Sequence, residues 1–239
     1  MKIGGWQKIS LIDYPGKIST IIFTQGCNFR CPFCHNPELV LKERYSSLIK
    51  EDLIFAFLKK RKGEIEGVEV TGGEPTLQED LEVFLKKVKK LGYLVKLDTN
   101  GSKPEVLEKL FKKNLLDYLA VDIKGPFEKY EEIIGGVKVD LNKIKESIRL
   151  IKDSGVDYEF RTTFVRPLLV IDDFEKIGEI IKGAKRFVIQ NFTPYHYGAG
   201  FTGRKFVKED NNFFPASQKE LEESQKVVKK YVQEVLLRD

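Results

Sequence analysis

The three cysteines of this 239-residue chain lie within one short segment, Cys27-Asn-Phe-Arg-Cys31-Pro-Phe-Cys34-His35. Three thiolates on a tight loop can hold three corners of a cubane iron–sulfur cluster. The fourth iron then has no protein ligand and is open to a small molecule, which makes the cluster reactive. An odd number of cysteines also argues against a disulfide framework. The spacing therefore predicts a 4Fe–4S cluster held by Cys27, Cys31 and Cys34.

Three other interpretations of these residues remain open. The pair Cys31 and Cys34, two residues apart, resembles a thioredoxin-like redox pair, but that fold is much shorter and leaves Cys27 unexplained. Cys31-x-x-Cys34-His35 also matches the attachment pattern of a c-type haem, which normally implies export, and the N-terminus carries no export signal. Three thiolates and one imidazole could hold a structural zinc ion, although adjacent Cys34 and His35 would have difficulty sharing one tetrahedral metal.

Strand-length apolar runs alternate with helical patterns along the chain, which predicts parallel β–α–β units. We expect strands at 18–25, 67–73, 93–101, 117–125, 156–165 and 185–194. We expect helices at 46–62, 78–92, 104–114, 138–155, 170–184 and 217–237. Units of this kind can build either a doubly wound sheet or a partial barrel.

The unusual polar residues lie where these strands end, at 25–34, 71–75, 98–101, 122–125 and 193–196. In parallel α/β folds the carboxyl ends of the strands form the functional site, so these segments are expected to meet there. The alternative is that loops simply collect polar residues.

Composition and charge indicate a folded protein without a nucleic-acid or membrane partner. The net charge of +5 comes from 41 basic and 36 acidic residues, most of them on mixed Lys/Glu helix faces that water would solvate. There is no apolar run of about 18 residues and no signal peptide, so we expect a cytoplasmic protein. We expect one domain over 1–239, with a core at about 18–194, an N-terminal segment 1–17, and a C-terminal loop and helix 195–239.

The C-x3-C-x2-C motif after the first strand, with aromatic Phe33 before the last cysteine, resembles the radical S-adenosylmethionine (SAM) superfamily. Gly72-Gly73-Glu74-Pro75 is similar to the GGEP motif of that family. The resemblance covers nearly the whole chain. It implies a partial (β/α)6 TIM-like barrel of parallel strands, with a 4Fe–4S cluster and SAM as cofactors. The GGEP backbone would meet the SAM amino group, because glycines allow the backbone to approach a ligand closely.

Further motifs resemble the glycyl-radical-enzyme activases: Cys34-His35-Asn36, Asp98-Thr99-Asn100-Gly101, Asp122-Ile123-Lys124 and Pro194-Tyr195-His196. The segment from Ser10 to Lys17 is similar to the opening of the activases of anaerobic ribonucleoside-triphosphate reductase. The resemblance implies reductive cleavage of SAM and removal of a glycine Cα hydrogen from a partner glycyl radical enzyme. A flavodoxin- or ferredoxin-type protein would donate the electron. The long loop 198–216 is a candidate docking element for the partner.

Three alternatives to this function stay open. One is an activase of the pyruvate formate-lyase type. Another is a radical SAM enzyme with a small-molecule substrate, such as 7-carboxy-7-deazaguanine synthase. The most distant is a non-catalytic metal or redox module, which would bind metal without cleaving SAM.

The resemblance also implies roles for single residues. Phe33 and His35 would lie near the SAM adenine, and Gly72, Gly73, Glu74, Thr99, Arg161 and His196 would also contact SAM. Lys124 would contact SAM or the incoming peptide in the catalytic step. Asp98, Thr99 and Asp122 resemble a monovalent-cation site, because hard oxygen ligands suit a hard cation.

Each of these roles has a simpler alternative. Asp98 and Asp122 could cap the turns that follow them. Lys124 could be an exposed lysine at a strand end, and Arg161 could pair with Glu159 on the surface. His196 could be a structural histidine.

Overall fold

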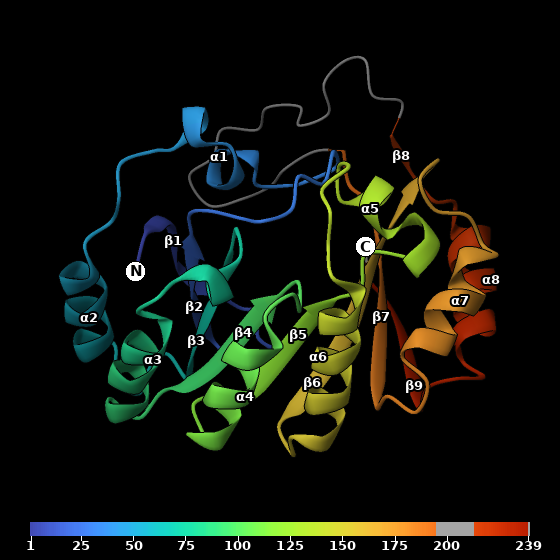
Figure 1. Ribbon diagram of the computed structural model, residues 1–239. Helices are drawn as coiled ribbons and strands as arrows, with labels where there is room; N and C mark the ends of the chain where they lie inside the picture. The colour runs from blue at the N-terminus through green and yellow to red at the C-terminus, as the bar shows by residue number, and fades with distance from the viewer. Residues whose placement is uncertain (195–212, 239) are drawn as a thin grey trace.

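A single curved sheet organises the chain (Figure 1), and the computed structural model describes it over residues 1–194 and 213–238. Its strands follow, in spatial order, β1 (Ile3–Ser10), β2 (Ser19–Thr24), β3 (Gly67–Gly72), β4 (Leu94–Thr99), β5 (Tyr118–Asp122), β6 (Asp157–Arg166), β7 (Arg186–Asn191) and β9 (Glu234–Arg238). Neighbours from β2 to β9 are parallel, whereas β1 is antiparallel to β2. The short β8 (Phe214–Pro215) pairs with the end of β6.

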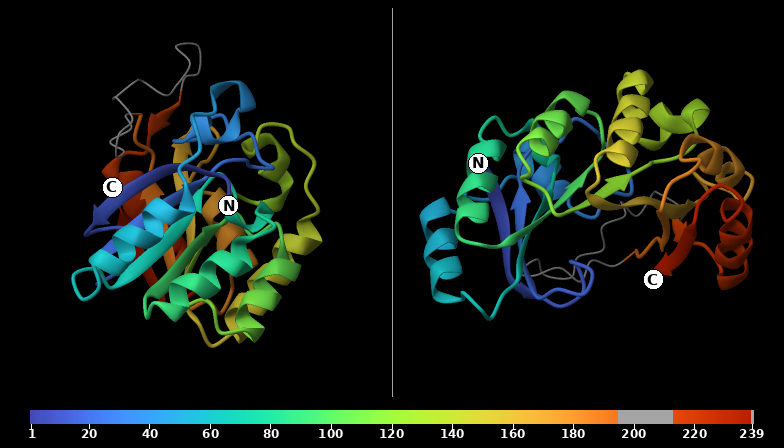
Figure 2. Two further views of the ribbon diagram at one scale, coloured as in Figure 1. Left: turned by 90° about the vertical axis from the view of Figure 1, so that its left-hand side faces the viewer. Right: turned by 90° about the horizontal axis from the view of Figure 1, so that it is seen from below.

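The main helices cover the convex outer face of this sheet, and none of the described helices lies over the concave face (Figure 2). They are α2 (Glu51–Lys60), α3 (Leu81–Lys90), α4 (Pro104–Lys112), α6 (Leu141–Asp153), α7 (Asp173–Ile180) and α8 (Gln218–Val228). Shorter turns lie in the loops at the carboxyl ends of the strands: α1 (Pro37–Val40), η1 (Lys42–Arg44), η2 (Pro75–Leu77), η3 (Phe127–Lys129) and α5 (Tyr130–Ile133). Among the described residues the strand path from β1 to β9 does not close, so the predicted partial TIM-like barrel is confirmed.

Helix α3 illustrates why these segments are helical. Its apolar side chains recur every three or four residues, and Leu81, Phe84, Leu85 and Val88 are all buried against the sheet. Each such burial stabilises the fold by about 1.5–3 kcal/mol. The helix ends before Gly92, whose φ of 86° is a left-handed conformation that favours glycine.

The strands alternate apolar and charged residues, and this alternation decides where the core lies. Val68 and Val70 on β3 pack toward the helices, whereas Glu69 between them points to the opposite face. Strand β4 repeats the pattern, with Val95 and Leu97 in the apolar cluster. Successive side chains of a strand point to opposite faces. The main apolar core therefore lies between sheet and helices, and the concave face carries polar groups.

Both ends of the sheet differ from the sequence prediction. The predicted helix 217–237 is wrong in its second half, because α8 ends at Val228 and Glu234–Arg238 form β9. The free edge of β7 offers backbone partners to this segment, and such tertiary pairing overrides helix propensity. At the other end the N-terminal segment forms β1. The turn after it buries Tyr14 against Gly67, beside the ring of Tyr118.

Within the described residues, every helix is too short or too polar to cross a lipid bilayer.

Candidate functional site

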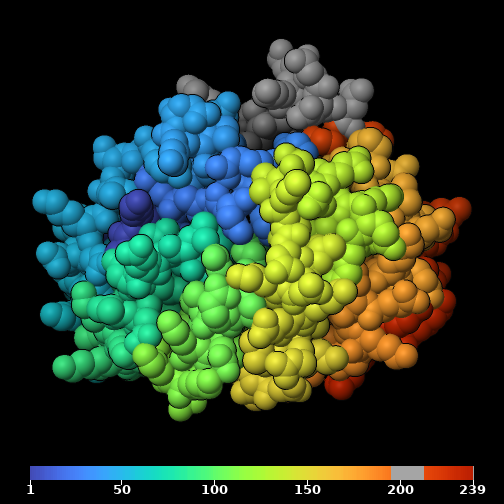
Figure 3. All heavy atoms as spheres, in the orientation of Figure 1, coloured from blue at the N-terminus to red at the C-terminus, as the bar shows by residue number. Residues whose placement is uncertain are grey.

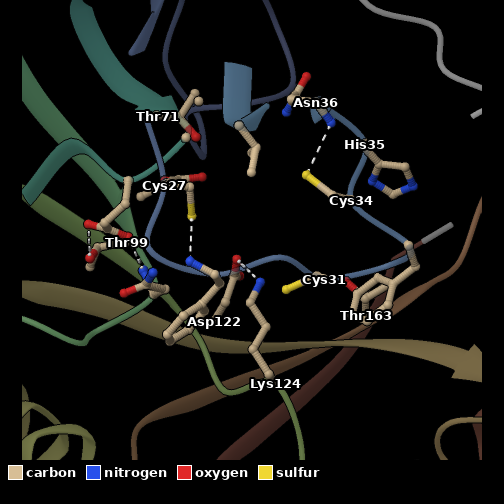
Figure 4. A pocket seen from close by; sticks show the side chains of 18 of the residues that line it. Cys27, Cys31, Cys34, His35, Asn36, Thr71, Thr99, Asp122, Lys124 and Thr163 are labelled. Atoms are coloured by element: carbon tan, nitrogen blue, oxygen red, sulfur yellow. Dashed lines mark hydrogen bonds and ion pairs between the residues drawn. The ribbon is translucent and has the colours of Figure 1, made fainter. Parts of the chain in front are cut away.

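A cavity of about 230 Å³ opens at the carboxyl ends of the parallel strands. Residues from the loops after β2, β3, β4 and β5, and from β6 and β7, line it (Figure 4). On the outer face of the sheet, α3, α4 and α6 lie side by side in front of the strands (Figure 3). The structure thus gathers four of the five polar segments that the sequence placed at strand ends, namely 25–34, 71–75, 98–101 and 122–125. Of the fifth segment only Thr193 and Pro194 are described, and neither lines this cavity.

The three cysteines lie on the loop after β2, and their sulfur atoms face this cavity (Figure 4). Backbone N–H groups orient two of them: Phe29 donates to Cys27 Sγ and Asn36 donates to Cys34 Sγ, both at 3.4 Å. Burial raises the pKa of Cys27 to about 12 and that of Cys31 and of Cys34 to about 11. A metal that bound these thiols would have to displace their protons, which would make loading of the site dependent on pH.

The donor set fits a cluster better than a single metal ion. Over 1–194 and 213–238, no three His, Cys, Asp or Glu side chains gather closely enough to hold one ion. The cysteines instead surround a shared space, as a cubane needs when each thiolate binds a different iron. His35 does not complete a zinc site, because its Nε2 lies 3.1 Å from the carbonyl oxygen of Thr193 and its ring stacks on Phe192.

The glycine turn after β3 is hydrogen-bonded to the end of β2 and to the start of the cysteine loop. Gly73 N–H donates to Thr24 O at 2.8 Å, and Glu74 N–H donates to Gly26 O at 2.7 Å. A Cβ on Gly73 would lie 2.1 Å from the Gly26 carbonyl oxygen, and Gly72 has a φ of 111°. Glycine is thus required at both positions, by close approach at one and by conformation at the other.

The Glu74 side chain joins β3 to β4. It is buried, and its Oε1 accepts hydrogen bonds from Thr76 N–H at 3.0 Å, from Thr76 Oγ1 at 2.5 Å and from Thr99 Oγ1 at 2.7 Å. Its Oε2 accepts one from Asn100 N–H at 2.7 Å. Burial raises the pKa of Glu74, although these hydrogen bonds oppose the change. Any contact of Gly72–Glu74 with a ligand therefore falls to the backbone.

Arg161 on β6 lies between two aspartates. Its Nη1 is 2.9 Å from Asp98 Oδ2, and its Nε donates to Asp122 Oδ1 at 3.0 Å. Lys124 Nζ binds the other oxygen of Asp122 at 2.9 Å (Figure 4). Burial alone would raise the pKa of Asp122, but Lys124 and Arg161 hold it well below its usual range. The same competition, with Arg161 and Lys96 as the cations, lowers the pKa of Asp98.

The structure brings most of the predicted site residues to the cavity. Phe33, His35, Gly72, Gly73, Glu74, Asp98, Thr99, Asp122, Lys124 and Arg161 line it together with the cysteines. The hydroxyl of Thr99 is directed to Glu74 rather than to the aspartates. His196 lies outside the described residues, as does most of loop 198–216.

Sequence reasoning missed that three charged side chains are buried beneath the cavity. They are Glu69, Lys96 and Glu159, each at most 3% exposed, with Arg238 beside Glu159. The alternative in which Arg161 pairs with Glu159 on the surface is wrong, because Glu159 is 1% exposed and its Oε1 lies 4.0 Å from Arg161 Nη1. A signal was available: Glu69, Lys96 and Glu159 each lie between two apolar residues of a strand, at the position that faces away from the helices.

The sequence between residues 21 and 182 matches the radical SAM superfamily, and the chain belongs to that superfamily. Its cofactors are a 4Fe–4S cluster and SAM, and Cys27, Cys31 and Cys34 around the cavity are a fitting donor set. Within the superfamily the chain belongs with the glycyl-radical-enzyme activases. It is 37% identical to a Methanocaldococcus jannaschii protein assigned to those activating enzymes, over 99% of this chain and 95% of that one.

Two other relatives match most of the chain. Pyruvate formate-lyase-activating enzyme of Streptococcus mutans is 31% identical over 85% of this chain and 80% of its own. The 7-carboxy-7-deazaguanine synthase of Thermococcus kodakarensis is 28% identical over 80% and 85%. Among solved structures, Streptococcus suis SuiB bound to SAM superposes with a TM-score of 0.67 at 16% identity, over 92% of this chain and 50% of that one. This last likeness is one of fold.

Proposed function

We propose that the chain removes a hydrogen atom from one glycine Cα of a partner enzyme, and that the partner is an anaerobic ribonucleoside-triphosphate reductase. The observation that carries the activase part is the relative that matches over nearly the whole chain. The reductase part rests on the segment from Ser10 to Lys17, which resembles the opening of the reductase activases. That segment forms the turn between β1 and β2 and buries Tyr14 beneath the barrel.

When bound, the cluster and SAM supply the reductive cleavage of a carbon–sulfur bond, which yields methionine and a 5′-deoxyadenosyl radical. Cys27, Cys31 and Cys34 would hold the cluster, and SAM would bind beside it in the same cavity. Phe33, His35 and His196 would flank the adenosyl group, and the backbone of Gly72–Glu74 would accept from the SAM amino group. Arg161 faces the cavity and would lie near the SAM carboxylate, to which a guanidinium is a strong donor.

The partner glycine would lose one hydrogen atom to the 5′ carbon, and the unpaired electron would remain on its Cα. Glycine suits this reaction because its Cα has no side chain that blocks approach. Lys124 lies at the cavity wall beside Asp122 and would contact the incoming peptide or SAM. The electron would come from a flavodoxin- or ferredoxin-type protein. We place the reaction in the cytoplasm, where the three free cysteines would stay reduced.

A second candidate is a small-molecule radical SAM enzyme of the 7-carboxy-7-deazaguanine synthase type, because one such enzyme matches most of the chain. The two candidates differ in what consumes the radical. An activase leaves a stable radical on a second protein, whereas the alternative converts a small molecule and needs no protein partner.

Anaerobic reconstitution with iron and sulfide, followed by reduction in the presence of SAM, tests the proposal. We expect 5′-deoxyadenosine from the wild type and none from Cys31→Ala. Mixing with purified anaerobic ribonucleotide reductase should then give a glycyl radical signal in electron paramagnetic resonance. A signal with pyruvate formate-lyase alone would move the partner to that enzyme. Turnover of the deazaguanine precursor without any protein radical would overturn the activase assignment for this chain.

A further inference from the structure

The two aspartates that line the cavity already have a cationic partner on each carboxylate oxygen. Asp98 Oδ1 is 2.5 Å from Lys96 Nζ, and its Oδ2 is 2.9 Å from Arg161 Nη1. Asp122 Oδ1 accepts from Arg161 Nε at 3.0 Å, and its Oδ2 accepts from Lys124 Nζ at 2.9 Å. Each of the four carboxylate oxygens therefore has a side-chain cation at hydrogen-bonding distance.

Lys96 is the most enclosed of these cations, at 1% exposure. Its ammonium lies between Asp98 and Glu69, whose Oε1 is 3.1 Å away. A lysine buried to this extent needs a carboxylate partner to remain charged. Asp98 on the same strand supplies one, and Glu69 on β3 adds a further oxygen at hydrogen-bonding distance. Its position is fixed by register, because Lys96 pairs with Glu69 across β3 and β4. The Lys96 ammonium group is thus held at a fixed position inside the barrel.

The third residue that the sequence suggested as a cation ligand, Thr99, also has its hydroxyl oxygen in hydrogen bonds. Thr99 Oγ1 donates to Glu74 Oε1 at 2.7 Å and accepts from Gly101 N–H at 3.2 Å. Within the part of the chain that the structure describes, no three acidic, cysteine or histidine side chains surround a point where one ion could sit. A hard cation prefers several oxygen ligands, and here it would instead lie beside fixed positive charges that repel it.

We propose that Lys96 and Arg161 are built-in cations that take the place of a monovalent metal ion in this site. They neutralise Asp98 and Asp122 and leave the guanidinium of Arg161 at the cavity wall, where it would lie near the SAM carboxylate. SAM affinity should then be indifferent to the choice of Na⁺, K⁺ or a bulky organic cation. This inference rests on the proposed function only in that the cavity binds SAM; it does not depend on the partner.

Calorimetric titration of SAM into the reconstituted protein tests this, in NaCl, KCl and choline chloride at equal ionic strength. We expect dissociation constants that agree within about twofold, since a cation without differential affinity shifts no equilibrium. Tightening by about fivefold or more in Na⁺ or K⁺ would be the coupling expected of a bound cation and would overturn the proposal. The melting temperature of the metal-free protein in the same salts is a second readout, and a rise specific to Na⁺ or K⁺ would equally contradict it.

The variant Lys96→Met sharpens the test. It removes one fixed cation and frees Asp98 Oδ1, so SAM should now bind at least about fivefold more tightly in Na⁺ or K⁺ than in choline. Lys96→Arg should keep the indifference of the wild type. Lys86→Met is the matched control, because Lys86 pairs with Glu82 on the exposed face of α3. A folded Lys96→Met protein that remains indifferent would overturn the proposal. If Lys96→Met does not fold, Lys96→Gln replaces it.

Failure of this inference and failure of the proposed function are distinguishable. Cation-dependent SAM binding together with partner activation would overturn only the proposal that Lys96 and Arg161 replace a monovalent metal ion. Cation-independent binding without a glycyl radical would sink only the activase proposal.

Discussion

Thr99 and Glu74 are joined by a hydrogen bond of 2.7 Å that ties the carboxyl end of β4 to that of β3. Asn100 N–H binds the other carboxylate oxygen, so both oxygens of one buried side chain are used to connect the two strand ends. The glycine turn that carries Glu74 in turn binds the start of the cysteine loop through Gly26. Glu74 thereby connects three segments around the cavity, two through its carboxylate and the third through its backbone N–H.

Replacing this carboxylate by an amide should destabilise the protein. In Glu74→Gln either orientation of the amide directs its NH2 group at an N–H or O–H donor. We expect a loss of about 1–3 kcal/mol in the free energy of unfolding, typical of a buried polar group left unsatisfied. Urea denaturation of the metal-free protein measures it, with Glu79→Gln at an exposed position as the control. Equal stability of the Glu74→Gln and Glu79→Gln proteins would show that the hydrogen bonds of the Glu74 carboxylate do not contribute to stability.

Glu69 should give the folded state a pH dependence. Burial, together with the charge of Asp98, raises the pKa of Glu69 from 4.5 to about 8. The folded state then binds this proton more tightly than the unfolded state, so the contribution to stability is full below about pH 4.5 and is lost as the pH rises toward 8.

The variant Glu69→Gln cannot ionise and should lack that decline. Relative to the wild type, its free energy of unfolding should therefore improve steadily between pH 5 and pH 8, as measured by urea denaturation at several pH values. Glu66→Gln is the matched control, because Glu66 is exposed, pairs with Lys17 and has a lowered pKa. Parallel pH profiles for Glu69→Gln and the wild type would rule out a raised pKa.

A methyl group on Gly73 should disturb the cysteine loop. The Cβ would lie 2.1 Å from the Gly26 carbonyl oxygen, so the turn and the loop must move apart in Gly73→Ala. We expect iron binding about tenfold weaker, comparable with losses on changing residues that support metal ligands. Iron titration under anaerobic conditions measures this. Gly5→Ala is a milder control, since its nearest neighbour would be Phe23 Cβ at 3.3 Å. Unchanged iron affinity in Gly73→Ala would contradict the supporting role of the turn.

Arg238 anchors β9 to the barrel interior. Its two terminal nitrogens lie 3.2 and 3.3 Å from the oxygens of Glu159, which is 1% exposed. Arg238→Met would leave that carboxylate with Tyr118 and a more distant Arg161, so we expect a loss of about 1–3 kcal/mol of stability. Guanidinium denaturation compares it with Arg44→Met, which changes an exposed residue of η1. If both variants unfold at the same denaturant concentration, β9 does not depend on this contact.

The strands β2 to β7 could be predicted because each is a short apolar run between turn residues, and the cysteines because their spacing is specific. The sheet ends could not. Residues of β9 read as a continuation of α8, and only the unpaired edge of β7 makes an extended conformation favourable there. That unpaired edge exists only in the folded sheet, so the local sequence of 234–238 cannot reveal it.

The site was predictable residue by residue but not in its pairings. Asp98 and Asp122 were expected to share an ion, and Arg161 was expected to contact SAM. That Arg161 reaches both aspartates depends on the register of β4, β5 and β6, which places Asp122 directly beside Arg161. Lys96 escaped notice because a single lysine in a strand usually marks a solvent-facing position.

The alternation along the strands also bears on how such a protein can change over time. Side chains that face the helices form the main apolar core, and those that face the cavity supply the polar groups of the site. A substitution on the inner face can therefore alter what the cavity accepts while the apolar layer behind it remains intact. Because the residues that stabilise the barrel and the residues that contact a substrate lie on different faces of the sheet, one fold can serve enzymes that act on different molecules.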